Sequence, residues 1–343
     1  MTISSRPTPF SFLEAKNWRD YELLDSGDGL KLERFGMYVF ARPESQAMWS
    51  RALSSTEWNN VDAVFQPTAE ESGGHWIEKK KLPEHWEMKY PLTLALSQKE
   101  RGLPSPSGEG LGIRELSFSV MTTPGRHLGV FPEVAVHWDF MAEKIRGVKS
   151  LPTFDSQRRG PKGDDKSLDS KKVNVLNLFG YTGLASLAAA AAGAQVTHVD
   201  ASKKSVAWAR KNQALSGLDD KSIRWIVEDA VKYMQREAKR GMKYDGIILD
   251  PPKFGRGPKG EVWEVYKSLP NLFELCRACL SEEPLFVIAT LYAARASAIH
   301  VAQALDEMMK KYRGEIDCGE LVTREKSANR LLSQAVYAKW YTR

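Results

Sequence analysis

Cysteine is scarce in this sequence, whose 343 residues include only Cys276, Cys279 and Cys318. Three cysteines cannot form a disulfide framework, and their scarcity points to a reducing compartment. Cys276 and Cys279 form one C-x-x-C inside an apolar, helix-like pattern, and no second pair exists to complete a zinc site. The pattern favours a structural role for this pair, and we expect no metal.

A hydrophobic run long enough to cross a membrane is also missing, because no stretch of about 18 apolar residues occurs. The N-terminus lacks the apolar core of a secretory signal. Acidic residues are in the minority, and the formal net charge is +6. This excess is compatible with nucleic acid, although solvated lysine faces produce it more often. We expect a cytoplasmic protein without a membrane partner, and the composition leaves the oligomeric state open.

The most informative stretch runs from Val173 to Ser202. Its first residues, through Phe179, form a short apolar run that is typical of a buried strand. Gly180 and Gly183 follow, then an alanine-rich helical segment and a second strand that ends on Asp200. A strand, a glycine turn, a helix, a strand and an acid together predict the first unit of a nucleoside-binding α/β domain.

Each part of this unit suits a bound nucleoside. Glycines let the backbone turn sharply and approach a ligand, and the following helix points free N–H groups at it. Asp200 stands 20 positions after Gly180, the spacing of an acid that accepts the ribose hydroxyls. A tight turn in an ordinary α/β protein is the alternative, which the joint occurrence of turn, helix and acid disfavours.

The short glycine loop limits which nucleoside can bind. Only Gly180 and Gly183 are present, whereas a dinucleotide site prefers the full G-x-G-x-x-G. The aromatic neighbours Phe179 and Tyr181 do not suit a pyrophosphate. We therefore expect S-adenosylmethionine (SAM), a nucleoside with a sulfonium and an amino-acid tail, and we disfavour a nicotinamide dehydrogenase.

Two more acids follow predicted strands, in IRWIVED and YDGIILD, which end on Asp229 and Asp250. Ligands of open α/β sheets bind beyond the carboxyl ends of the strands. We expect Asp229 to accept a hydrogen bond from the adenine amino group, with help from the Ala230 backbone. Each acid alone is more often a helix cap, but acids at matching positions after three successive strands favour a role in ligand binding.

The chain divides into four predicted parts. Residues 1–20 are expected to be a loose leader, and the alternating pattern of residues 21–90 predicts a small, mostly β, N-terminal module. Residues 91–114 are rich in Pro, Gly and Ser and predict an inserted low-complexity loop. Residues 115–343 alternate between strands and helices, with a flexible linker expected at 156–172. This last part predicts a Rossmann-like domain, with a mostly parallel seven-stranded sheet and an antiparallel edge strand.

Five short motifs follow one another along the chain: NLFGYTG, HVDAS, ARKN, VEDA and DPPKF. They resemble the successive motifs of class I SAM-dependent methyltransferases. The likeness is strongest to the bacterial 23S rRNA methyltransferases that make 5-methylcytosine or 7-methylguanine, and it covers residues 116–295. It implies a class I methyltransferase fold, SAM as cofactor, and RNA, most of all ribosomal RNA, as substrate.

The resemblance also assigns residues to the site. It places the cofactor against Phe179, Gly180, Tyr181, Thr182, Gly183, Asp200, Ala201, Ser202, Asn212, Asp229, Ala230 and Asp250. It places the methyl acceptor and the catalytic residues at Asp250, Pro251, Pro252, Lys253 and Phe254. The segment 126–133 matches the family's segment that leads into the domain and reaches the cofactor.

The Asp-Pro-Pro turn suggests how the acceptor is held. Asp250 can accept a hydrogen bond from an amine and stabilise positive charge that develops on nitrogen. Phe254 is expected to stack on a base, and Lys253 to meet a phosphate or to pair with an acid. The next strand reads FVIATLYA, without the cysteine that 5-methylcytosine enzymes of the group carry just after it. We therefore expect a base nitrogen as acceptor. A small-molecule or protein methyltransferase and a non-catalytic binding module are the alternatives.

Overall fold

The computed structural model describes most of the chain, namely residues 9–68, 73–92, 114–149, 172–292 and 296–343. Most of the loop expected at 91–114, and all but the last residue of the linker expected at 156–172, lie outside these residues. Within the described ranges, no helix is long and apolar enough to cross a membrane.

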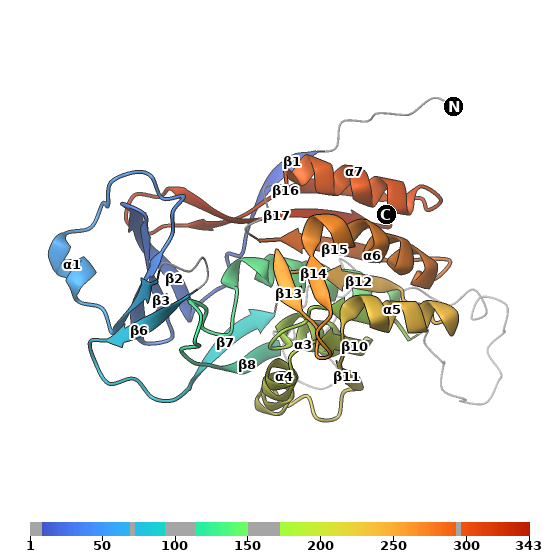
Figure 1. The fold of residues 1–343 in the computed structure, drawn as a ribbon, viewed down its shortest axis with the longest axis horizontal. Helices are drawn as coiled ribbons and strands as arrows, with labels where there is room; N and C mark the ends of the chain where they lie inside the picture. Colours follow the sequence, from blue (N-terminus) through green and yellow to red (C-terminus); the bar gives the residue numbers. More distant parts are fainter. Residues whose placement is uncertain (1–8, 69–72, 93–113, 150–171, 293–295) are drawn as a thin grey trace, which may run out of the picture.

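An eight-stranded sheet forms the centre of the molecule, in the order β1-β16-β17-β15-β12-β9-β10-β11 (Figure 1). Five of its strands run parallel to one another: β9 (Asn174–Leu178), β10 (Gln195–Asp200), β11 (Ile223–Val227), β12 (Gly246–Leu249) and β15 (Phe286–Leu291). The inner strands β12 and β15 are wholly buried and mostly aliphatic, as a sheet covered on both faces requires.

The other side of the sheet differs from the expectation in two ways. Strand β17 (Leu331–Tyr341) is antiparallel, but it lies between β15 and β16 (Glu315–Arg324) and not at the edge. The edge is an eighth strand, β1 (Phe10–Glu14), which pairs in parallel with β16. The prediction of a loose leader is therefore wrong for these residues, because their hydrogen-bond partners lie at the far end of the chain.

Helices cover both faces of this sheet. On one face lie α2 (Ala135–Lys149) and α3 (Leu184–Ala191), and on the other α5 (Ala230–Lys239), α6 (Val265–Cys279) and α7 (Ala298–Met309). Helix α4 (Lys203–Leu215) packs against β10 and β11. The neighbours Ile247 and Ile248 on β12 enter separate hydrophobic cores, because successive side chains of a strand point to opposite faces.

A second sheet of five strands forms the N-terminal part, in the order β2-β3-β4-β5-β6. Its elements are β2 (Tyr21–Gly27), β3 (Leu30–Phe35), β4 (Tyr38–Pro43), α1 (Ser55–Asn59), β5 (Ala63–Pro67) and β6 (Gly74–Glu78). A hairpin joins β2 to β3, where Asp28 and Gly29 adopt the positive φ of 51° and 74° that a two-residue turn needs.

Strands β7 (Trp86–Leu92) and β8 (Arg114–Val120) pair antiparallel in a small sheet of their own. They include Pro91, Leu92 and Arg114, which we expected in the inserted loop. Strand β8 packs against α4, so this hairpin joins the N-terminal sheet to the α/β domain.

A short hairpin follows the Asp-Pro-Pro turn, formed by β13 (Phe254–Arg256) and β14 (Val262–Glu264). The sequence predicts a helix from 262 onward, but α6 begins only at Val265. Pro270 lies inside α6 without ending it.

The long strands β16 and β17 reach beyond the central sheet to the N-terminal sheet (Figure 1). Between them, Arg330 forms a salt bridge of 3.3 Å with Asp25 on β2 and donates to the Ser26 carbonyl at 3.0 Å. Asp25, which is fully buried, also accepts from Trp58 Nε1 at 2.8 Å. These contacts fix the N-terminal sheet beside the carboxyl ends of the parallel strands.

Candidate functional site

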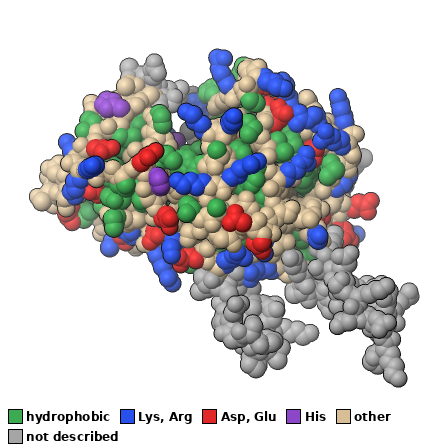
Figure 2. All heavy atoms as spheres, turned by 90° about the horizontal axis from the view of Figure 1, so that it is seen from below, with side chains coloured by type: hydrophobic (Ala, Val, Ile, Leu, Met, Phe, Trp, Pro, Cys, Tyr) green, Lys and Arg blue, Asp and Glu red, His purple; other side chains and the backbone are tan. Residues whose placement is uncertain are grey.

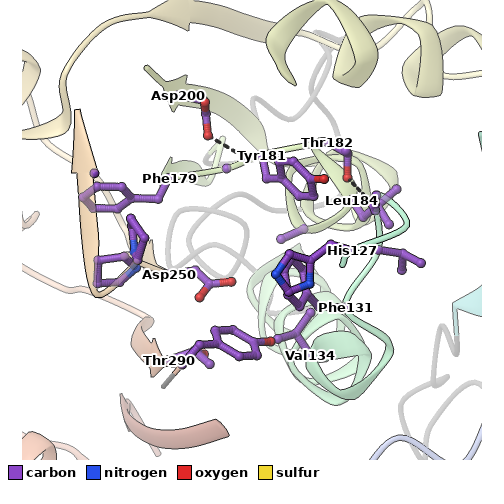
Figure 3. Close-up of a pocket in the computed structure, with 18 of the residues that line it drawn as sticks. His127, Phe131, Val134, Phe179, Tyr181, Thr182, Leu184, Asp200, Asp250 and Thr290 are labelled. Atoms are coloured by element: carbon purple, nitrogen blue, oxygen red, sulfur yellow. Dashed lines mark hydrogen bonds between the residues drawn. The ribbon is translucent and has the colours of Figure 1, made fainter. Parts of the chain in front are cut away.

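A pocket of about 830 Å³ lies beyond the carboxyl ends of β9, β10, β11 and β12 (Figure 3). One wall comes from the loops after these strands, and another from the N-terminal sheet, including Lys31, Arg42 and Glu44. This is the place where parallel α/β sheets bind their ligands.

The loop after β9 has backbone conformations that residues other than glycine rarely adopt. Phe179 and Tyr181 have φ of 59° and 48°, and Gly183 has φ of 85°. A side chain at Gly180 would place its Cβ 2.4 Å from the His198 ring, so tight packing demands this glycine. Non-glycine residues in the left-handed region concentrate at binding sites, where the strain is held by the surrounding structure.

Asp200 at the end of β10 holds this loop from the side. Its carboxylate accepts hydrogen bonds from Tyr181 N at 2.9 Å and Ser202 N at 2.8 Å. Burial raises the pKa of Asp200, and these two N–H donors oppose the rise. Figure 3 shows the carboxylate beside the loop, and Ala201 and Ser202 line the same pocket.

Asp229 follows β11, where it both caps a helix and lines the pocket. It is the N-cap of α5, where its Oδ1 accepts from Lys232 N at 3.0 Å. It also lines the pocket, together with Ala230. The two readings of the sequence, helix cap and ligand residue, are thus compatible, because a carboxylate has a second oxygen.

All the expected cofactor residues line the pocket except Gly183 and Asn212, and Asn212 has a place of its own. It is fully buried on α4 and is not among the pocket-lining residues. Its Nδ2 donates to Thr182 O at 3.0 Å, and its Oδ1 accepts from Ser119 N at 2.9 Å. Thr182 in turn donates to Gly129 O at 2.7 Å. Asn212 therefore supports the glycine loop from behind.

The Asp250 side chain points into the middle of the pocket (Figure 3). Burial, followed by the charge of Glu133, raises the pKa of Asp250 to about 8. Glu133 lies on a 3₁₀ turn, η1 (Pro132–Val134), and is itself only 5% exposed. Burial raises the pKa of Glu133 as well, while the charge of Lys31 lowers it. Two acids thus share one poorly hydrated space.

Aromatic rings face Asp250 across the pocket. The Phe131 ring lies 4.8 Å from the His127 ring and 4.9 Å from the Tyr292 ring, measured between centroids. Burial and the nearby cations Arg42 and Arg126 lower the pKa of His127 to about 3, which keeps its imidazole neutral. The His127 and Phe131 rings point toward the same space as the Asp250 carboxylate (Figure 3).

Pro251, Pro252 and Lys253 line the pocket as expected, but Phe254 does not. Its side chain is 59% exposed. Pro252 O accepts a hydrogen bond of 2.7 Å from the indole of Trp263. This buried tryptophan holds the chain after the Asp-Pro-Pro turn.

Sequence reasoning missed the contribution of the N-terminal sheet. Lys31 Nζ donates to Gln334 Oε1 at 2.9 Å, and both residues line the pocket. Arg42 donates to Arg126 O at 2.8 Å and forms a salt bridge of 2.5 Å with Glu33. No local pattern marks these residues, because their partners are distant in sequence. Phe131, Glu133 and Tyr292 were equally inconspicuous, although the segment 126–133 was singled out.

Comparison with known proteins decides the family. Residues 162–282 match the family model of S-adenosylmethionine-dependent methyltransferases. The crystal structure of the SAM-dependent methyltransferase from Agrobacterium tumefaciens is 39% identical, with a TM-score of 0.79, and the match covers 98% of this chain and 96% of that chain. This chain belongs to the SAM-dependent methyltransferases. A SAM-dependent methyltransferase from Streptococcus mutans shares the fold at 19% identity and a TM-score of 0.61, over 94% of this chain and 76% of that chain. A further methyltransferase structure, with the same identity, TM-score and coverage, is complexed with SAH.

Two curated relatives of this methyltransferase carry a ribosomal RNA name. The ribosomal RNA large subunit methyltransferase K/L of Shewanella sp. (strain ANA-3) is 38% identical over 115 residues, which are 33% of this chain and 16% of that protein. The one of Shewanella baltica (strain OS155 / ATCC BAA-1091) is 43% identical over 93 residues, 27% of this chain and 13% of that protein. The chain thus spans only a small part of these relatives. The predictions of a Rossmann-like methyltransferase domain, a separate N-terminal β module and SAM as cofactor are confirmed.

Proposed function

We propose that this methyltransferase modifies a base nitrogen in RNA, and that ribosomal RNA is its substrate. The observation that carries the proposal is the Asp250 carboxylate, which points into a pocket faced by the His127 and Phe131 rings (Figure 3). A planar amine fits between a carboxylate and aromatic rings, because the carboxylate accepts its N–H and the rings pack on its faces.

The cofactor half of the pocket fits SAM in the chemistry of its side chains. Acids stand at the ends of β10, β11 and β12, and the glycine loop stands at the end of β9. We assign Asp200 to the ribose hydroxyls, Asp229 and Ala230 to the adenine, and the loop 179–183 to the methionine end. Bound SAM supplies an electrophilic methyl group on a sulfonium.

The acceptor half provides a place for a proton. An amino group that gains a methyl group must lose a proton, and Asp250 lies where it can receive it. Because its pKa is about 8, only a minority of Asp250 is ionised at neutral pH, but this ionised form is a stronger base than an ordinary carboxylate. Methyl transfer otherwise depends on alignment, which the rigid Asp-Pro-Pro turn supplies.

The three cysteines argue against transfer to carbon 5 of cytosine. That reaction needs a thiol nucleophile beside the base. Cys276 and Cys279 are buried in α6 and Cys318 in β16, and none of them lines the pocket. Burial also raises the pKa of the Cys279 thiol, to about 11, which keeps it protonated.

RNA as the substrate is supported by the ribosomal RNA methyltransferases among the relatives and by the net charge of +6. Cations also stand at the mouth of the pocket, where Arg126 and Arg256 are exposed. Cations at the rim of a site can meet the phosphates on either side of a target nucleotide.

Labelled methyl transfer tests the proposal. The protein and tritiated SAM are incubated with ribosomal RNA from a strain that lacks the gene, and in parallel with its protein and metabolite fractions. Label in ribosomal RNA, located on a base nitrogen by nucleoside analysis, is the expected result. Label confined to protein or to small molecules would refute RNA as the acceptor and leave the enzyme class intact. An Asp250→Ala control should transfer no label.

A further inference from the structure

The β13–β14 hairpin stands at the rim of the pocket, where Gly255, Arg256 and Gly257 belong to its lining. Its pairing sorts its side chains onto two faces. Phe254 pairs with Glu264 and Arg256 with Val262, and directly paired residues share a face. Gly255 and Trp263, which pair with each other, therefore occupy the opposite face.

The inner face anchors the hairpin firmly. Trp263 is 4% exposed, its ring lies 4.8 Å from the Phe179 ring, and its indole donates to Pro252 O. At the base of the hairpin, Val265 N donates to Lys253 O at 3.0 Å. At the tip, Glu261 forms a salt bridge with Lys232 on α5. These contacts fix the hairpin at its inner face, at its base and at its tip, so the orientation of its outer face is fixed as well.

The outer face presents large apolar side chains to solvent. Phe254 is 59% exposed, Val262 74%, and Tyr266, just beyond β14, 51%. Lys253 Nζ lies 5.3 Å from the centroid of the Phe254 ring, and Arg256 is exposed beside it. Figure 2 shows Lys and Arg side chains spread over one face of the α/β half of the molecule, with hydrophobic side chains exposed among them.

Exposed aromatic rings beside cations suit a single-stranded nucleic acid. Bases stack on the rings, and phosphates meet the cations. Phe254 is exposed and does not line the pocket that holds Asp250, so its ring lies outside the space of the base that is methylated there. It is placed at the rim, where the strand would continue.

We infer that the outer face of the β13–β14 hairpin is a platform for the RNA nucleotide next to the methylated one, with Phe254 stacking on its base and Arg256 meeting its phosphate. This inference rests on RNA as the substrate. It differs from the sequence-based expectation, which placed Phe254 among the catalytic residues.

Alanine substitution with matched controls tests the platform. The probe is a fluorescein-labelled single-stranded RNA of mixed sequence, about 12 nucleotides long, within the range of site sizes for such proteins. Phe254→Ala should raise the Kd for this RNA about 30-fold, the middle of the range for one stacked base. Phe12→Ala is the control, because Phe12 is 58% exposed but lies on the edge strand β1. Phe254→Trp should retain the affinity.

Arg256→Ala should change the salt dependence. Removing one phosphate contact should lower the slope of log K against log salt by about 0.7 for single-stranded RNA. Arg313→Ala is the control, since Arg313 is exposed and precedes β16, at the end of the sheet away from the pocket. The Kd of every variant for SAM is measured as well, and it should match the wild type.

The outcomes separate the platform from the proposed function. If the wild type methylates ribosomal RNA and Phe254→Ala binds RNA as tightly as Phe12→Ala, the platform is refuted and the function stands. If no RNA is methylated or bound by the wild type, both fall. If Phe254→Ala lost SAM affinity to the same degree as RNA affinity, the residue would belong to the pocket, which would overturn the placement on a separate surface.

Discussion

Replacing Asp250 with asparagine should make the protein more stable and inactive at the same time. Asparagine has the same shape as aspartic acid but carries no charge at any pH. In the wild type, burial and the charge of Glu133 raise the pKa of Asp250 from 3.8 to about 8. The site therefore penalises the ionised form, and Asp250→Asn removes that penalty.

The sign and size follow from proton linkage. Between pH 4 and pH 8 the folded protein keeps a proton on Asp250 that the unfolded chain has released. Folding stability of the wild type therefore falls as the pH rises through this window. For each pH unit in this window, the free energy of unfolding of the wild type falls by about 1.4 kcal/mol relative to that of Asp250→Asn. The difference in unfolding free energy between the two proteins should therefore grow by up to about 4 kcal/mol from pH 5 to pH 8.

Urea unfolding of the protein without SAM, followed by circular dichroism at pH 5, 6, 7 and 8, measures this difference. Comparing the two proteins at each pH cancels the titration of groups that do not interact with Asp250. Glu133 does interact, so the pair is measured again in a Glu133→Gln background. The gap should then be smaller, because one cause of the raised pKa is gone. Methyl transfer by Asp250→Asn should be lost at every pH.

A stability gap that stays constant from pH 5 to pH 8 would refute the reasoning, because it would show that Asp250 titrates alike in the folded and unfolded chain. Retained methyl transfer by Asp250→Asn would instead refute the role of its carboxylate. The expected combination of higher stability and lost activity is typical of sites where function opposes stability.

Two further substitutions test the cofactor half. Asp200→Ala removes a partly buried carboxylate that accepts from Tyr181 N and that we assign to the ribose, so the Kd for SAM in calorimetry should rise about 100-fold or more. Binding as tight as the wild type would place the ribose elsewhere. Gly180→Ala places a Cβ 2.4 Å from the His198 ring, and it should lower the free energy of unfolding by about 1–3 kcal/mol as the loop shifts. An unchanged melting temperature would show that the loop accommodates the methyl group without cost.

The α/β part of the fold was predictable because its signals are local. The alternation of strands and helices, the helix cap at Ser202 and the glycine loop all depend on residues within about one helical turn or one strand of each other. The sequence also predicted that Asp200, Asp229 and Asp250 lie close together, because parallel strands place their carboxyl ends at one edge of the sheet.

The remainder depends on pairing between distant segments. Strand β1 finds its partner in β16, and β17 inserts between β15 and β16, although neither fact leaves a local mark in the sequence. The β13–β14 hairpin was hidden for another reason. Val262 and Trp263 continue the apolar pattern of α6, so the strand was predicted as the beginning of the helix.

The N-terminal sheet contributes to the electrostatics of the pocket as well as to its walls. Two acids in one poorly hydrated space, Asp250 and Glu133, would both be driven toward the neutral form by burial. Lys31, on β3 of the N-terminal sheet, is only 8% exposed, and its positive charge opposes this effect at Glu133. Lys31 forms an ion pair with Glu44 in the N-terminal part and donates a hydrogen bond to Gln334 in the methyltransferase domain, so it contacts both parts of the chain. The protonation of these two acids is therefore set jointly by the N-terminal sheet and the methyltransferase domain, which local sequence patterns in either part could not reveal.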